Sequence, residues 1–116
     1  MTRINPKINE VTEELLRNTQ RVLGDRLRKI IIYGSYARGD YKEYSDLDIM
    51  ILADYDETEE KTIENQLSVI ANDASLDHDI TVCMLLNNEN LFMSRLPISP
   101  FYRNVLSEGI ELYVAY

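Results

Sequence analysis

The motif Asp46-Leu47-Asp48 places two carboxylates two residues apart at the start of an apolar run. On a β-strand, side chains two apart share a face, so both carboxylates project to the same side, with backbone positions roughly 6.5–7 Å apart. Mg²⁺ in proteins is bound through one or two carboxylates, with room left for substrate phosphates. The motif therefore predicts a site for divalent ions, although an Asp-X-Asp alone is also typical of the solvated start of an amphipathic strand.

The residues that follow favour the metal site. Met50 and Leu52 continue the face of the aspartates and are apolar, whereas Leu47, Ile49 and Ile51 take the opposite face. The strand is therefore predicted to enter a core, with the two acids at the end of the strand where it enters. Two carboxylates about 5 Å apart repel by roughly 3 kcal/mol at an effective dielectric constant near 20. A fold tolerates such a pair more readily where a cation cancels the charge.

A second candidate element is Gly34-Ser35, which follows the β-branched run 29–33 directly. A glycine there lets the backbone turn sharply and approach a ligand closely. Ser35 is predicted to cap a short helix over residues 36–38, which leaves backbone N–H groups and a hydroxyl for phosphate oxygens. An ordinary strand-to-helix turn is the alternative interpretation. The sequence lacks the glycine motifs of P-loop and dinucleotide sites, so those sites are excluded.

A third carboxylate is expected from residues 78–86, where alternating apolar residues predict another strand. Asp79 heads one face of that strand, and it would join Asp46 and Asp48 if the two strands are neighbours. Asp77 has the same parity but is predicted to lie further out, in the turn, so Asp79 is preferred. Cys83 falls on the face of Asp79, deeper in the strand, and is interpreted as a small core residue.

The elements that must position these residues follow from periodicity and capping signals. We expect a helix over 5–23, begun by Asn5 and Pro6 and ended by Gly24. Strands are expected over 29–33, 46–52 and 78–86, a helix over 57–74 begun by a capping box, short helices over 88–96 and 101–106, and a strand or extended tail over 110–114. This order predicts one small α/β or α+β domain over residues 1–116, with a sheet of three or four strands flanked by helices. It does not decide which strands are parallel.

Composition limits the partners. Among 116 residues, 12 are basic and 20 acidic, for a net charge of -8, and no basic stripe follows the chain. Proteins that bind polyanions usually carry a basic face, so long nucleic acid is not expected as a direct partner. The single cysteine excludes an intrachain disulfide and favours a reducing compartment. Because the apolar runs are far too short to span a bilayer and no signal segment is evident, we expect a soluble, cytoplasmic protein with no membrane partner.

These motifs resemble a known family. Gly34-Ser35, ten intervening residues and then Asp46-Leu47-Asp48 before an apolar strand are similar to the DNA polymerase β-like nucleotidyltransferases. The fuller motifs, from Gly34 to Gly39 and from Ser45 to Asp48, look like the minimal nucleotidyltransferase (MNT) branch. The resemblance covers about residues 5–114. It implies a small mixed sheet flanked by helices, the nucleotidyltransferase fold.

The resemblance also implies an activity and its residues. Asp46 and Asp48 would hold two Mg²⁺ ions, and Asp79 would hold one of them and help to deprotonate the attacking hydroxyl. Gly34 and Ser35 would cradle the β- and γ-phosphates of a nucleotide such as ATP. Paired ions stabilise both the entering and the leaving oxygen of an in-line displacement. Arg38 matches an arginine of the family and would either bind phosphate or pair with a sheet carboxylate to fix the loop.

In the MNT branch the chain usually accompanies a HEPN ribonuclease toxin encoded nearby. The resemblance therefore implies an antitoxin that moves AMP from ATP to a toxin tyrosine, a protein adenylyltransferase. Two other functions stay open, namely an enzyme acting on a small hydroxyl compound, as aminoglycoside nucleotidyltransferases do, and a non-catalytic module that neutralises the toxin by covering it. The nucleotide, the target residue, the number of AMP units and the homo- or hetero-oligomeric state are not predicted.

Overall fold

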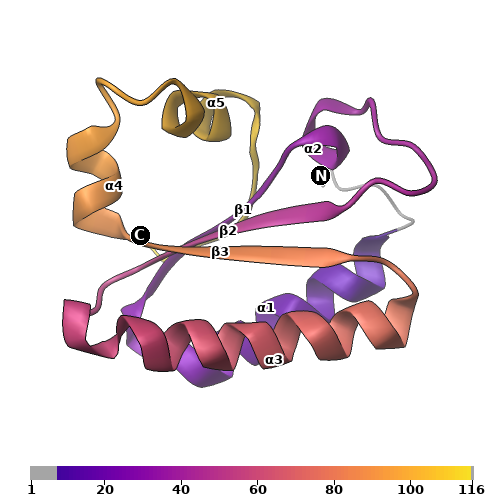
Figure 1. The fold of residues 1–116 in the computed structure, drawn as a ribbon, viewed down its shortest axis with the longest axis horizontal. Helices are drawn as coiled ribbons and strands as arrows, with labels where there is room; N and C mark the ends of the chain where they lie inside the picture. The colour runs from indigo at the N-terminus through magenta and orange to yellow at the C-terminus, as the bar shows by residue number, and fades with distance from the viewer. Residues whose placement is uncertain (1–7, 116) are drawn as a thin grey trace.

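A mixed four-stranded sheet with helices on both faces forms the protein, as seen in a computed structural model that describes residues 8–115 (Figure 1). Strands alternate with helices for most of the chain. The elements are α1 (Asn9–Leu23), η2 (Gly24–Arg26), β1 (Leu27–Tyr33), α2 (Ser35–Arg38), β2 (Leu47–Ala53), η3 (Glu57–Glu59), α3 (Glu60–His78), β3 (Val82–Asn88), α4 (Glu89–Arg95), α5 (Pro100–Glu108) and β4 (Ile110–Val114).

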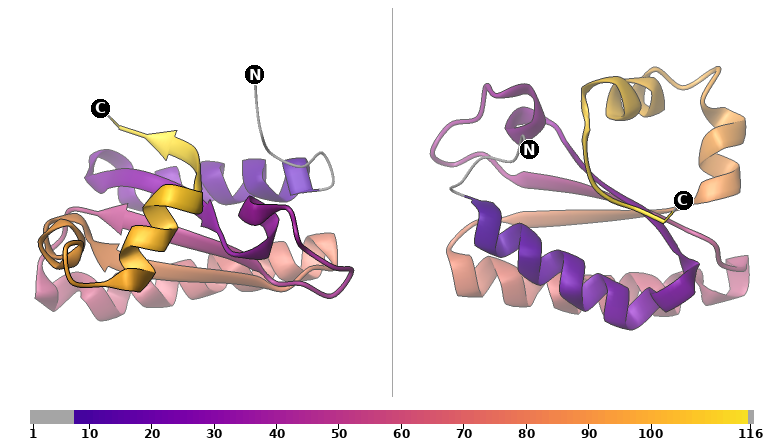
Figure 2. Two further views of the ribbon diagram at one scale, coloured as in Figure 1. Left: turned by 90° about the horizontal axis from the view of Figure 1, so that it is seen from above. Right: turned by 180° about the vertical axis from the view of Figure 1, so that it is seen from behind.

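The sheet has the order β3-β2-β1-β4. β1 pairs antiparallel with both β2 and β4, whereas β2 and β3 are parallel and joined by the crossover helix α3. Figure 2 shows β4 lying along the far side of β1, so residues 110–114 form a strand rather than a tail. The predicted mixed sheet of three or four strands flanked by helices is confirmed.

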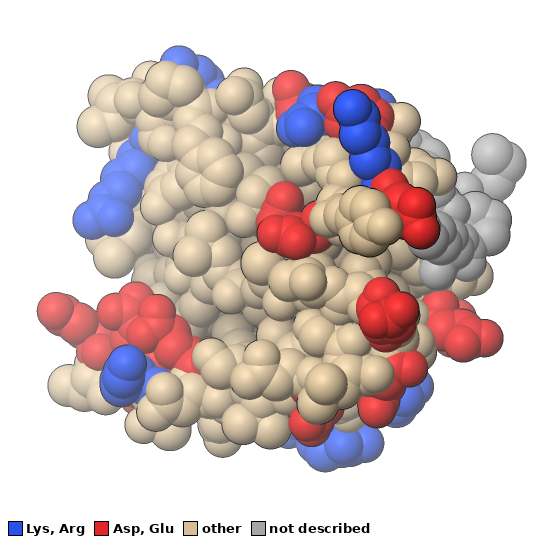
Figure 3. Space-filling model, turned by 45° about the vertical axis from the view of Figure 1, so that its right-hand side comes forward, with Lys and Arg blue, Asp and Glu red and all other residues tan. Residues whose placement is uncertain are grey.

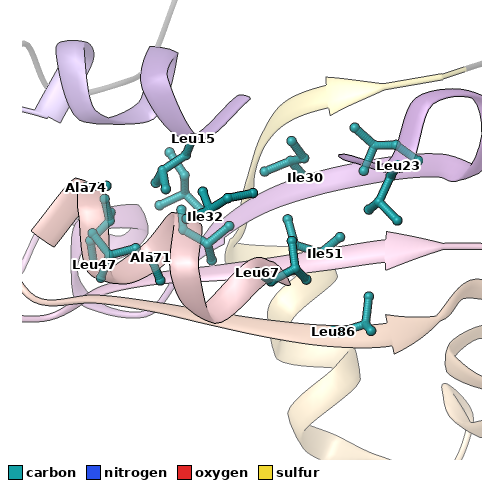
Figure 4. Close-up of a cluster of buried hydrophobic side chains, with 14 of the residues drawn as sticks. Leu15, Leu23, Ile30, Ile32, Leu47, Ile51, Leu67, Ala71, Ala74 and Leu86 are labelled. Carbon is teal, nitrogen blue, oxygen red and sulfur yellow. The ribbon is translucent and has the colours of Figure 1, made fainter. Parts of the chain in front are cut away.

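The main core lies between the sheet and the pair α1 and α3, which cover one face together (Figures 1 and 2). Side chains along β1 and β2 point alternately to the two faces of the sheet, and the set that faces α1 and α3 is apolar. Figure 4 shows Ile30, Ile32, Leu47 and Ile51 meeting side chains from both helices. Each of these four strand residues is at most 1% exposed. The predicted inward face of the second strand is thereby confirmed.

The opposite face carries a smaller cluster beneath α4 and α5. Ile31, Met50 and Leu52 rise from the sheet and pack against Phe92 and Val105. Met50 and Leu52 lie on the face of Asp48 and are at most 1% exposed, which confirms that this strand enters a core behind the acids. The two aspartates therefore stand where a buried apolar surface gives way to solvent.

The ends of the helices agree with most sequence signals. Gly24 ends α1 with a positive φ of 53°, and Asp56 and Glu59 form the predicted capping box. The predicted helix start at Asn5 and Pro6 lies outside the described residues. Within the described residues, no helix is long and apolar enough to cross a membrane.

The predicted start of the third strand is wrong. α3 continues to His78, four residues beyond the expected end at 74, and Asp79 follows it in the left-handed conformation with φ 51° and ψ 47°. β3 begins only at Val82. Ser75 explains the change, because its carbonyl accepts hydrogen bonds from the N–H groups of Asp79 and Ile80, and its hydroxyl accepts one from Val82. One serine thus ends the helix and starts the strand.

Candidate active site

A pocket of about 620 Å³ is lined by residues of α2, the start of β2 and α5. Figure 1 shows α2 and α5 on the same side of the sheet. The pocket lining joins residues from the β1–α2 turn, the start of β2 and one side of α5. These residues are Tyr33, Gly34, Ser35, Arg38, Ser45, Asp46, Asp48, Phe101, Asn104, Val105 and Glu108. Gly34, Ser35, Arg38, Asp46 and Asp48, which were singled out in the sequence, therefore share one cavity. Figure 3 shows a face with acidic side chains near its middle, acidic and basic ones above them, and a mainly uncharged surface toward the upper left.

The two aspartates differ in exposure. Asp46 precedes β2 and is exposed, whereas Asp48 is half-buried within the strand, opposite Tyr33 of β1. Burial raises the pKa of the Asp48 carboxyl above its ordinary value, and the negative charge of Asp46 raises it further, while Arg38 opposes both effects. The protein alone therefore disfavours the charge on Asp48, and a cation at this place would relieve that cost.

Gly34 holds the backbone directly against Asp48. Its φ is +75°, and a Cβ built on it would lie 2.5 Å from the Asp48 Oδ2 atom. A side chain here would meet both backbone strain and a direct clash with the carboxylate. The glycine is thus required both by the turn, as predicted from the sequence, and by the position of the Asp48 carboxylate; the predicted close approach to a ligand stays a prediction.

Ser35 begins α2 but does not cap it as predicted. Gly34 occupies the N-cap position, no side chain caps the helix, and the first internal bonds run from the N–H groups of Ala37 and Arg38 to the Gly34 carbonyl. The N–H groups of Ser35 and Tyr36 lie in the first turn of α2, where backbone donors have no partner within the helix. Ser35 lines the pocket, so its N–H and its hydroxyl are the donors that this turn offers there.

Arg38 is exposed at the rim and pairs with carboxylates outside the sheet. Its Nε lies 3.2 Å from Asp40 Oδ2, and its Nη1 lies 3.6 Å from Glu108 Oε2 at the end of α5. The hydrogen bond to Asp40 is the main reason that the pKa of the guanidinium is raised. Among the described residues no ion pair joins Arg38 to a sheet carboxylate, although its charge lowers the pKa of Asp48. Its role in binding phosphate stays a prediction.

Asp79 does not join the other two acids. Because α3 extends to His78, Asp79 is an exposed helix C-cap, and it lines a separate pocket with residues of α1 and the loop before β2. Asp77, the weaker candidate, lies within α3. The predicted placement of Asp79 on a strand beside Asp46 and Asp48 is therefore wrong.

Cys83 takes the place on β3 where the third acid was expected. The parallel register sets Cys83 opposite Asp48, and its Sγ lies 4.0 Å from Asp46 Oδ2. It is exposed, so its predicted role as a core residue is wrong. Burial, Asp46 and Asp48 all raise the pKa of the thiol, which keeps it protonated and unreactive at neutral pH.

Sequence reasoning missed the contribution of α5. Phe101, Asn104, Val105 and Glu108 follow helical i, i+3, i+4 and i+7 spacing and turn one side of the helix toward the pocket. That spacing was visible in the sequence. The chain reversal that folds α5 back over the acid-bearing face was not, because it depends on packing of Phe92 and Val105 with the sheet.

The donors present fit Mg²⁺. The pocket offers carboxylate oxygens whose charge is unfavourable without a cation, and Mg²⁺ is typically bound by one or two carboxylates plus substrate phosphates. Across residues 8–115, no group of three or more His, Cys, Asp or Glu side chains is placed to hold a metal ion. Asp46 and Asp48 are therefore the residues that would hold such an ion, with substrate phosphates and water as further ligands.

Comparisons with known proteins identify relatives of the chain. Two Methanocaldococcus jannaschii proteins, each named "putative protein adenylyltransferase", resemble the chain: one is 39% identical over 88 residues, covering 76% of this chain and 80% of its own. The other is 32% identical over 108 residues, covering 91% and 99%.

Solved structures share the fold. A Sulfolobus solfataricus protein named "putative nucleotidyltransferase" has a TM-score of 0.62 at 16% identity, over 91% of this chain and 79% of that chain. A toxin–antitoxin crystal structure with AMP-PNP has a TM-score of 0.55 at 19% identity, over 90% and 73%. The sequence pattern of the nucleotidyltransferase domain matches residues 8–111. The chain belongs to the nucleotidyltransferase domain family.

Proposed function

We propose that this nucleotidyltransferase moves AMP from ATP to a tyrosine hydroxyl of a HEPN-type toxin encoded nearby, and thereby acts as its antitoxin. The observation that carries the proposal is the shared pocket of Asp46, Asp48, Gly34 and Ser35. Further support comes from the relatives named as protein adenylyltransferases and from the toxin–antitoxin complex that has the same fold.

In the proposed reaction, the turn at Gly34 and Ser35 binds the β- and γ-phosphates through its free N–H groups and the serine hydroxyl. Asp46 and Asp48 would hold two Mg²⁺ ions, which would supply Lewis acidity to the phosphate under attack and stabilise developing negative charge. A tyrosine oxygen attacks the α-phosphorus while the bond to the β-phosphate oxygen breaks. Pyrophosphate leaves, and the phenol proton passes to solvent at the open mouth beside the exposed Asp46.

The test is a transfer assay with the protein product of the neighbouring gene. The chain, ATP and Mg²⁺ are incubated with that product, and its intact mass is measured. A gain equal to one or more AMP groups, absent with Asp46→Asn and with Asp48→Asn, supports the proposal. Modification of a small alcohol with the protein partner unmodified would instead identify an enzyme of the aminoglycoside nucleotidyltransferase kind.

One observation favours a second candidate, a non-catalytic antitoxin that covers its toxin. Cys83 stands opposite Asp48 on β3, and among residues 8–115 no third side chain is placed to hold a metal ion together with Asp46 and Asp48. Two-metal enzymes depend on a well-held cation pair, so a reduced ligand set would weaken catalysis first. A tight complex with the toxin, unchanged by Asp48→Asn and formed without any mass gain, would establish this alternative.

A further inference from the structure

The wall of the pocket opposite the acids has a different chemistry from the rest. Phe101, Asn104 and the buried Val105 of α5 line the same cavity as Asp46 and Asp48. A pocket of about 620 Å³ lies within the range of roughly 300–1,000 Å³ found for small-molecule sites. One wall therefore suits phosphates and cations, and the other offers an aromatic surface with one polar group.

Phe101 is an aromatic side chain that is only partly used by the protein. Its ring makes an edge contact with Tyr33, with centroids 5.7 Å apart and planes at 78°, yet 44% of the residue stays exposed. Burying such a ring is favourable, so an exposed one that lines a pocket is suited to receive a flat ligand. Tyr33 is paired with Asp48 across the sheet, which places the Phe101 ring near the acid pair.

Asn104 supplies a polar group beside that ring. Among the described residues no hydrogen bond engages its carboxamide, whereas its main-chain carbonyl lies within the helix and accepts one from the Ser107 hydroxyl. A carboxamide can donate and accept at the same time. Adenine presents the matching pair, an N6 donor beside an N7 acceptor, whereas guanine presents two acceptors, O6 and N7.

The helix that carries both residues, α5, is fixed in place by packing and hydrogen bonds. Phe92 stacks on Tyr102 at 4.4 Å, the Tyr102 hydroxyl donates to Asn87 Oδ1 at 3.0 Å, and Val105 is 2% exposed. Ser99 caps the helix by accepting from the Tyr102 N–H. A rigid aromatic surface binds a ligand with little loss of conformational entropy.

The direction of α5 sets the orientation of a nucleotide. Its last turn reaches Arg38 through Glu108, at the phosphate-binding end of the pocket, and Phe101 lies seven residues earlier. That separation is about 10 Å along a helix, comparable to the distance from a triphosphate to its base. A nucleotide with its triphosphate at the Gly34–Ser35 turn and its α-phosphate near Asp48 would therefore extend its base toward Phe101.

We infer that α5 forms the nucleobase subsite of this enzyme, in which Phe101 stacks on the base and Asn104 selects adenine by pairing with its N6 and N7 edge. This inference rests on the proposed function, since it assumes that a nucleoside triphosphate is the substrate. It adds two residues outside the acid and glycine motifs and assigns them to base specificity.

The experiment compares ATP, GTP and inorganic tripolyphosphate as ligands of the intact chain with Mg²⁺, by titration calorimetry. Phe101→Ala should weaken ATP binding roughly tenfold, the usual size of a stacking contribution, and leave tripolyphosphate affinity within about twofold. Phe101→Leu, which keeps an apolar contact with Tyr33, should lose a similar factor. Asn104→Ala should reduce the preference for ATP over GTP. Ile98→Ala, which removes an 81% exposed side chain outside the pocket, is the matched control and should change nothing.

The outcomes separate this inference from the proposed function. If the wild-type chain binds ATP and neither Phe101→Ala nor Asn104→Ala changes the affinity, the base subsite is overturned and the proposed transfer is left intact. Equal losses for ATP and tripolyphosphate would also overturn it, because the variants would then act on the phosphate end. A wild-type chain that binds neither ligand would overturn the proposed function, and this inference with it.

Discussion

Replacing Gly34 by alanine tests the geometry of the acid pair most directly. Gly34 has φ +75° and ψ -152°, a region that is almost restricted to glycine. A residue with a side chain is strained there by roughly 1–3 kcal/mol. At about 4 °C for each kcal/mol in a domain of this size, Gly34→Ala should lower the melting temperature by about 4–12 °C.

The same substitution should also displace a catalytic group. The new Cβ would lie 2.5 Å from Asp48 Oδ2, whereas ordinary contact begins at 3.4 Å, so the carboxylate or the turn must retreat by about 1 Å. A misplacement of about 1 Å at a reacting centre can lower the rate roughly 100-fold. We therefore expect Gly34→Ala to lose about two orders of magnitude in adenylyl transfer, far more than its folded fraction explains.

Gly24→Ala is the matched control. Gly24 has φ 53° and ψ -128°, a similar conformation, yet a Cβ there would meet nothing within 4 Å. It should lose comparable stability and retain near-wild-type transfer at a temperature where both variants are folded. Calorimetry gives the melting temperatures, and mass spectrometry of the acceptor gives the rates. If Gly34→Ala and Gly24→Ala proved equally active, the inferred contact between Gly34 and the catalytic acid would have no functional role.

Three further substitutions examine the charges. Asp48→Asn should abolish transfer and raise the melting temperature of the metal-free chain at neutral pH. Because the pKa of Asp48 is raised in the folded state, the stability that its protonated form contributes is present at acidic pH and lost as pH rises. The gain in melting temperature, measured by calorimetry in EDTA, should therefore vanish toward low pH. Cys83→Asp should destabilise the metal-free chain and tighten Mg²⁺ binding measured by calorimetry, since it sets a third carboxylate opposite Asp48; unchanged Mg²⁺ affinity would contradict this placement. Asp79→Asn should leave transfer within about twofold of wild type, because asparagine tolerates the left-handed conformation and the side chain lies outside the pocket; a large loss of rate would return Asp79 to the site.

Local patterns predicted the parts of the site that are local. The alternation of Leu47, Ile49 and Ile51 with Asp48 and Met50 is contained in one strand, and the structure buries each set on the predicted side. The turn at Gly34 is likewise set by adjacent residues. Both could be predicted because a period of two and a positive φ leave a direct signature in the sequence.

The error at Asp79 has a specific cause. Residues 78–86 alternate as a strand would, yet the first of them continue a helix whose buried residues are spaced by three and four. Which pattern prevails is decided by Ser75, which bonds to Ala71, Asp79 and Val82 around the turn. A serine that joins a helix end to a strand start has no periodic signature, so this boundary could not be located from periodicity.

The absence of an acid opposite Asp48 on β3 bears on how a metal site here would work. Asp46 and Asp48 are the carboxylates at the start of β2, Glu108 is the other described acid that lines the pocket and it pairs with Arg38, and two carboxylates cannot neutralise two divalent cations. Under the proposed function the phosphates of the nucleotide would supply further negative charge, because they are hard oxygen ligands that the Gly34–Ser35 turn would bring to the pocket. Metal and substrate would then bind together rather than in sequence. The phosphates held by the turn would in this way complete the coordination of a metal ion at Asp46 and Asp48, beside which Cys83 offers a thiol in place of an oxygen ligand.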